Sequence, residues 1–178
     1  MRYVALLRGI NVGGKGIIKM TELKAAMANC GFANVKTYIQ SGNVIFESDE
    51  EKTSNIASRM ERCILKAFKI DSQTIVITYD QIKKVVSEVP PDWDQRNDLR
   101  RYIAFIREPV TPLEVLKQIR LKEGVDFAKA GEGVVYMTTL LSGLTKSGFA
   151  KLVSTKVYKD ITIRNYSTVQ KLLTLMEE

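Results

Sequence analysis

The stretch RYVALLR at Arg2–Arg8 returns as RYIAFIR at Arg101–Arg107, and this echo constrains the fold more than any other feature of the chain. Apolar residues at successive positions in both stretches are typical of a strand that is covered on both faces. An apolar helical stripe also recurs at an offset of 87 positions, as Ile82, Val85, Val86 and Val89 and then as Val169, Leu172, Leu173 and Met176. An equal offset with an equal pattern indicates that the chain contains an internal duplication.

The first half predicts the order β-α-β-β-α-β, which is typical of a ferredoxin-like unit. Its strands are expected at 2–8, 35–40, 43–47 and 74–79, with Ser41-Gly42 joining the middle two as a hairpin. The second half repeats the plan, with strands expected at 101–107, 126–129, 134–138 and 160–164 and a short helix over 148–153. Leu113 is expected to face inward, and the predicted helix caps are Thr21, Asp80, Thr111 and Ser167.

The fold class predicted from this pattern is α+β, with tandem duplicated ferredoxin-like subdomains of βαββαβ plus one helix and mostly antiparallel sheets. The first half spans residues 1–90, a linker with the lone Trp93 spans 91–99, and the second half spans 100–178. RNA-recognition domains of this topology stack bases on exposed aromatic side chains of the sheet. Because the strands of Tyr3 and Tyr102 are apolar on both faces, we expect core packing for these two rings instead.

The composition excludes several kinds of active site, because the 178 residues include no histidine. Histidine is the usual general base near neutral pH and the commonest metal ligand. Cys30 and Cys63 lie at apolar helical positions, so we expect buried small hydrophobes and neither a disulfide nor a reactive thiol. With no signal-peptide pattern and no long apolar run, we expect a cytoplasmic protein that does not enter a membrane. No metal or cofactor is predicted.

Candidate binding residues cluster in the glycine-rich segment 9–16, which fits G-x-x-x-x-G-K. Gly16 stands where a nucleotide hydrolase needs Ser or Thr, and an antiparallel sheet does not suit that motif. Backbone N–H groups at Gly13 and Gly14 with Lys15 can still contact an anion; the alternative is a flexible turn that needs positive φ. Neighbouring residues, among them Arg8, Asn11, Ser41 and Asn43, are candidates to hold this loop or to contact its ligand. The alternatives are ordinary turn chemistry for Asn43 and a solvent contact at the end of the strand for Arg8.

A second candidate site follows from the net charge of +7 and from a basic stretch with Asp160 as its single acid. Its basic residues are Lys146, Lys151, Lys156, Lys159, Arg164 and Lys171. Together with Ser147 and Asn165, which lie near predicted helix starts, Lys146, Lys151 and Arg164 form a candidate anion site. Capping and ordinary surface charge are the alternative explanation.

Three segments resemble an uncharacterised bacterial family, the domain-of-unknown-function family 1697. They are RGINVGGK at Arg8–Lys15, YIQSGNVIF at Tyr38–Phe46 and ITIRN at Ile161–Asn165. Many members carry Trp after the Arg-Asn pair, whereas this chain has Tyr166. The resemblance implies duplicated ferredoxin-like halves and assigns no catalytic residue.

The sequence therefore predicts non-catalytic binding of a phosphate-bearing partner, a nucleic acid or a nucleotide, on a basic loop surface. A homo-oligomeric protein-interaction module and a small-molecule enzyme without histidine are the alternatives, and the oligomeric state is undetermined. An enzyme would use Lys15, Lys146 or an acidic residue as its reacting group.

Overall fold

The computed structural model describes residues 1–178, which form two compact units. The first unit comprises Met1–Lys83 and Lys171–Glu178, and the second comprises Lys84–Gln170. No helix is both long and apolar enough to cross a membrane. The predicted division into halves 1–90 and 100–178 with a linker at 91–99 stays a prediction.

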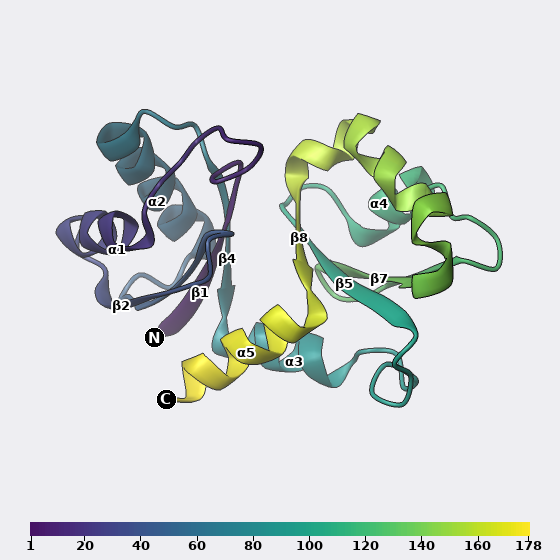
Figure 1. Cartoon of the computed structure of the whole chain (residues 1–178). Helices are drawn as coiled ribbons and strands as arrows, with labels where there is room; N and C mark the ends of the chain where they lie inside the picture. The colour runs from purple at the N-terminus through teal and green to yellow at the C-terminus, as the bar shows by residue number, and fades with distance from the viewer. The chain divides into compact units, whose positions relative to one another are not determined.

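The first unit contains a four-stranded antiparallel sheet in the order β2-β3-β1-β4, with α1 and α2 on one face (Figure 1). Its elements are β1 (Arg2–Arg8), α1 (Met20–Asn29), β2 (Ala33–Tyr38), β3 (Asn43–Glu47), α2 (Thr53–Phe68) and β4 (Gln73–Thr78). The helix α3 (Tyr79–Ser87) follows, and its residues from Lys84 onward belong to the second unit. In the register of the central pair, Tyr3 lies opposite Phe46 and Leu6 lies opposite Asn43. This chain order and strand order are those of a ferredoxin-like unit.

The second unit repeats the arrangement with the strand order β6-β7-β5-β8, again fully antiparallel. Its elements are β5 (Leu99–Ile106), α4 (Pro112–Gln118), β6 (Asp126–Ala130), β7 (Val134–Leu140), the 3₁₀ segments η1 (Leu141–Lys146), η2 (Gly148–Ser154) and η3 (Lys156–Asp160), and β8 (Ile161–Asn165). The helix α5 (Tyr166–Glu177) follows, and its residues from Lys171 onward belong to the first unit. The predicted α+β fold with two repeated ferredoxin-like subdomains is therefore confirmed.

Each unit has a core between one sheet face and its helices. In the first, Tyr3, Leu7 and Phe46 pack against α1 and α2 through Met27 and Met60. Tyr3 is fully buried and Tyr102 is half-buried against the core of the second unit, so neither ring is a bare stacking platform. In the second core, Ala104, Val135 and Ile161 pack against Val115 and Leu152, which come from α4 and η2.

The helix starts differ from the predicted caps except at α4. Thr111 and Glu114 form the expected capping box there. The hydroxyl of Thr78 accepts a hydrogen bond from the N–H of Gln81 at 3.2 Å, so Thr78 and not Asp80 caps α3. Thr21 and Ser167 fall inside the first turns of α1 and α5, because these helices begin at Met20 and Tyr166.

Two expectations for the second half were wrong in detail. Leu113 is 62% exposed, and Val115 is the α4 residue that is fully buried. The helix expected at 148–153 is the 3₁₀ segment η2, one of three such segments in a row. Glycine, serine, threonine and valine in this region have weak α-helical propensity. Ser147 and Thr155 have non-helical backbone dihedrals and separate the three 3₁₀ segments.

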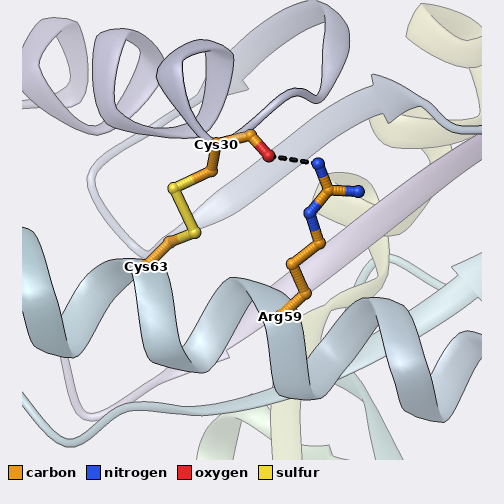
Figure 2. The surroundings of a disulfide bond; sticks show 3 residues. All are labelled: Cys30, Arg59 and Cys63. Carbon is orange, nitrogen blue, oxygen red and sulfur yellow. Dashed lines mark hydrogen bonds between the residues drawn. A yellow bond between two sulfur atoms is a disulfide. The ribbon is translucent and has the colours of Figure 1, made fainter.

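The two cysteines form a disulfide, so the expectation of two buried thiols was wrong (Figure 2). Cys30 ends α1 and Cys63 lies in α2, and their Cα atoms are 6.5 Å apart, within the range that a disulfide spans. Both side chains are half-exposed at the junction of the two helices. The Arg59 guanidinium donates to the Cys30 carbonyl and stacks over the Phe32 ring at 4.8 Å.

Candidate functional site

The glycine loop between β1 and α1 is closed at its base by Asn11. The Asn11 backbone N–H donates to the Gly16 carbonyl at 2.9 Å. Its side-chain oxygen accepts from the Ile18 N–H at 2.8 Å, and its amide nitrogen donates to the carbonyls of Ile18 at 3.0 Å and Gln40 at 2.9 Å. Asn11 therefore links the loop to the turn that follows β2.

The tip of the loop is open to solvent. Gly13 and Gly14 have φ of +58° and +74°, and a Cβ placed on either would meet no atom within 4 Å. These glycines serve the left-handed backbone and not a close approach of neighbouring protein atoms. Lys15 is exposed at the tip, and α1 begins only at Met20. The loop thus lacks the direct entry into a helix that a nucleotide hydrolase would need.

The turn between β2 and β3 lies beside the loop. The Gly42 carbonyl accepts from the Leu7 N–H at 2.8 Å, and a Cβ on Gly42 would lie 2.7 Å from Ile10. Asn43 is fully buried, and its amide donates to the Tyr38 carbonyl and the Ser41 hydroxyl, each at 3.0 Å. Asn43 thus orders its own turn, whereas the loop is held through Asn11 and through Ile10.

Arg8 ends β1 at the same edge of this sheet. Its carbonyl accepts from the Ser72 hydroxyl at 2.8 Å, and its side chain is half-buried. The structure therefore brings together the predicted residues of the first unit, and it leaves Gly13, Gly14, Lys15 and Ser41 exposed.

In the second unit, Asp126 organises the segment that carries Lys146, Ser147 and Lys151. The buried carboxylate accepts from the Ser147 hydroxyl and the Gly148 N–H, each at 2.7 Å, from the Lys122 N–H at 2.9 Å and from the Thr139 hydroxyl. Burial alone would raise the pKa of Asp126, but these hydrogen bonds outweigh it and lower the pKa overall. The Ser147 hydroxyl therefore has a structural partner. The charged side chains of Lys146 and Lys151 remain exposed.

Arg164 and Asn165, at the end of β8, differ in their exposure to solvent. Arg164 is 9% exposed on β8 and donates to the Ile163 carbonyl at 3.0 Å, and burial lowers its pKa to about 10. Asn165 is exposed at the end of the strand. The Arg164 guanidinium is largely shielded from solvent. A role for Arg164 in anion binding stays a prediction.

A larger group of cations covers the helical side of the second unit, and sequence reasoning found only part of it. We define the cationic helical face by the exposed basic residues of α4, of the turn after it and of η1–η3: Lys117, Arg120, Lys122, Lys146, Lys151, Lys156 and Lys159. These elements pack on the same side of the sheet, and α4 contacts η3. None of these cations forms an ion pair with an acid.

Of the acids on these elements, Glu114 and Asp126 are held by hydrogen bonds, and Glu123 is exposed beside Lys122. Hydrogen bonds from the backbone and hydroxyl of Thr111 hold Glu114 and lower its pKa. Asp126 is buried, and its four hydrogen bonds come from within the unit. Lys117, Arg120 and Lys122 were missed because they fall on another segment of the sequence. Only the packing of α4 beside the 3₁₀ segments brings them to the same side.

The carboxyl groups whose pKa is shifted do not have the raised pKa that suits a general acid. Every carboxyl group with a shifted pKa is shifted downward, namely Glu47, Glu50, Asp98, Glu114 and Asp126. A carboxyl group of lowered pKa stays deprotonated near neutral pH and is a poor general acid. The first unit has a hollow of about 470 Å³, whose acids Glu47 and Glu178 are paired with Arg2 at 3.3 Å and Lys36 at 3.5 Å.

Comparison with known proteins agrees with the family resemblance. The family model described as protein of unknown function (DUF1697) matches residues 1–136. A solved structure of a conserved bacterial protein, SP0830 from Streptococcus pneumoniae, is similar with a TM-score of 0.83 and 26% identity, over 98% of each chain. A search of curated proteins found no match.

Proposed function

We propose that this chain, which belongs to the DUF1697 family of proteins of unknown function, binds a phosphate-bearing ligand without catalysing a reaction. The ligand is a nucleic acid or a nucleotide, and the cationic helical face of the second unit carries most of the binding. The supporting observation is that the basic side chains of this face are exposed and form no ion pair. An anionic ligand therefore replaces water and counterions and does not have to break an existing salt bridge.

The electrostatic character of this surface defines the test. Each phosphate neutralised on a duplex contributes a slope of about −0.9 to the dependence of log affinity on log salt, and single strands give about −0.7. A ligand that covers four of these cations should lose affinity roughly a hundredfold between about 50 and 200 mM salt. We expect fluorescence anisotropy with labelled single-stranded and duplex oligonucleotides to show such a slope.

Two charge-reversal variants separate local from general electrostatics. The double variant Lys151→Glu/Lys156→Glu changes two cations of the face, and Arg62→Glu/Lys66→Glu changes two exposed cations of α2 in the first unit. Both alter the net charge by the same amount. The proposal expects at least a tenfold loss of affinity for the first variant and little change for the second. Equal losses, or no salt-sensitive affinity for DNA, RNA or nucleotides, would contradict it.

The glycine loop is proposed as an auxiliary anion contact. Its exposed Gly13, Gly14 and Lys15 fit that role, since open backbone at a left-handed turn presents N–H groups. Lys15→Ala should then weaken nucleotide binding with a smaller salt slope. An unchanged affinity would leave only the cationic helical face as a binding surface.

We also propose that the protein acts in the cytoplasm. Structural disulfides are rare there, so the Cys30–Cys63 pair is expected to be reduced for part of the protein's lifetime. Mass spectrometry after rapid alkylation of intact cells would show free thiols at both positions. Complete oxidation in growing cells would argue for an oxidising compartment.

A protein-interaction module remains the second candidate, and one observation favours it. Exposed apolar side chains accompany the cations on the second unit, namely Leu113, Leu121, Leu141, Leu144 and Val153. Contiguous exposed apolar surface marks interaction sites. Size-exclusion chromatography with light scattering should show concentration-dependent association if these side chains form an interface, and a monomer at every concentration if they do not.

A further inference from the structure

The segment after α3 covers the second unit's sheet on the face opposite to its 3₁₀ segments. Trp93 is 1% exposed, and its indole N–H donates to the Thr138 hydroxyl at 3.0 Å. Its ring meets those of Tyr136 and Tyr166 edge to face, with centroids 5.8 and 5.0 Å apart. The Tyr136 hydroxyl in turn donates to the Val85 carbonyl at 2.9 Å. These contacts hold Trp93 in place, so it belongs to the packed structure of the second unit.

A pocket of about 240 Å³ lies beside this indole. Its apolar lining comes mainly from Trp93, Leu99, Tyr136 and Phe127, and all of these belong to the second unit. Phe127 is 52% exposed on the edge strand β6, opposite Thr138 in the register. A half-exposed aromatic ring at the mouth of an apolar pocket offers a face on which a planar ring of a ligand can stack.

The polar groups at the pocket have both signs. Lys129 lies two residues after Phe127 and thus on the same face of β6, and it forms no ion pair. Asp92 supplies a negatively charged carboxylate to the lining of the pocket. The Arg96 guanidinium is held by Asp98 through two hydrogen bonds of 2.9 and 2.6 Å. The pocket therefore offers a donor and an acceptor without a strong net charge.

The volume of about 240 Å³ suits one fused ring system. At roughly 30 Å³ for each water of the liquid, the pocket has room for about eight waters, and it is smaller than the roughly 300–1,000 Å³ of sites for drug-sized ligands. A flat bicyclic ring with hydrogen-bonding groups on its edge can contact the apolar walls and stack on the half-exposed phenyl ring. Its edge groups can hydrogen-bond to the charged side chains of both signs.

We propose that this pocket binds an uncharged, purine-sized heteroaromatic ring, which stacks on Phe127 and hydrogen-bonds to Lys129 and Asp92. The site is distinct from the cationic helical face, because Phe127 and Lys129 alternate with Ala128, which packs against the core on the helical side. The ring is either a free nucleoside or the base of a nucleotide. The two sources share the ring and differ in the phosphate.

The chain supplies its own reporter for this test, because Trp93 is its single tryptophan and lines the pocket. Titration with adenosine and guanosine should change the Trp93 emission in a saturable way at up to about 1 mM ligand. The titration is repeated with the corresponding monophosphates. Tighter binding of the monophosphate would identify a nucleotide as the source, and equal binding a free nucleoside.

Variants distinguish the pocket from other surfaces. Phe127→Ala should weaken binding at least tenfold while its unliganded emission and far-UV circular dichroism match those of the wild type. Leu113→Ala, which truncates another exposed apolar residue of the same unit, should bind as the wild type does. Adenosine carries no phosphate, so its binding tests the pocket independently of the cationic helical face, and Arg62→Glu/Lys66→Glu should leave it unchanged. The absence of saturable change with both nucleosides, or wild-type affinity in Phe127→Ala, would overturn it.

Discussion

Replacing Asp126 with alanine is expected to be one of the most damaging single substitutions in the second unit. The carboxylate accepts four hydrogen bonds, and two come from the backbone N–H groups of Lys122 and Gly148. Those two donors cannot rotate away, whereas the hydroxyls of Thr139 and Ser147 can seek other acceptors. A buried donor left without an acceptor costs about 1–3 kcal/mol. Two of them give an expected loss of roughly 2–6 kcal/mol in the free energy of unfolding.

Urea denaturation followed by Trp93 fluorescence measures this loss, since Trp93 lies in the same unit. Glu123→Ala is the matched control, because it removes an exposed acid of that unit and should cost less than about 0.5 kcal/mol. A loss below about 1 kcal/mol for Asp126→Ala would refute the reasoning, because it would mean that the buried donors find other partners.

The pH dependence provides a second check on the same residue. Because the pKa of Asp126 is lowered in the folded protein, the stabilisation is complete above the unfolded value of about 3.9. It is lost as the pH falls through the lower, folded value. The stability difference between the wild type and Asp126→Ala should therefore be constant near neutral pH and shrink only in strong acid. A difference that already disappears between about pH 5 and 7 would contradict the lowered pKa.

Three further predictions concern the disulfide, a close backbone contact and the glycine loop. Reduction of Cys30–Cys63, which are separated by 33 positions, should destabilise the first unit by about 3–4 kcal/mol from loop entropy, measured by urea unfolding with and without dithiothreitol; an unchanged midpoint would show that the reduced unit is equally constrained. Gly148→Ala should cost more than about 2 kcal/mol, because its Cβ would lie 1.6 Å from the Arg120 carbonyl oxygen, and a wild-type Tm would count against this close packing. Asn11→Ala removes three side-chain hydrogen bonds and should speed amide exchange in the glycine loop with a loss of about 1–3 kcal/mol; unchanged exchange would mean that other contacts hold the loop.

The repeat made the topology predictable from the sequence. The apolar pattern of Arg2–Arg8 recurs at the start of the second half, and both strands are central in their sheets. Val85 and Leu172, which share the 87-position offset, are both buried. These features depend on the local periodicity of apolar residues, which can be recognised in the sequence alone.

The disulfide and the helix caps depend on longer-range geometry. Nothing in the spacing of Cys30 and Cys63 shows that α1 and α2 lie side by side, so their pairing was missed. At α3 the Thr78 hydroxyl accepts from the Gln81 N–H, and the Gln81 side-chain oxygen accepts from the Thr78 N–H. This reciprocal pair makes Thr78 the cap in place of the acid at Asp80.

The candidate sites were only partly predictable for the same reason. The glycine loop and Asn11 were identified from the sequence, because loop chemistry is local. Asp126 was missed because its partners lie on three other segments of the chain. Trp93 was assigned to a linker, since a short polar segment gives no sign that its single large ring is buried.

The most direct test of the cationic helical face is a chemical-shift map of the isotope-labelled protein during titration with a single-stranded oligonucleotide. Our account predicts that the largest shifts fall on α4, on the turn through Lys122 and on η1–η3, and that they fade as salt is raised. Shifts confined to the first unit, or shifts on the second unit that persist in high salt, would contradict it.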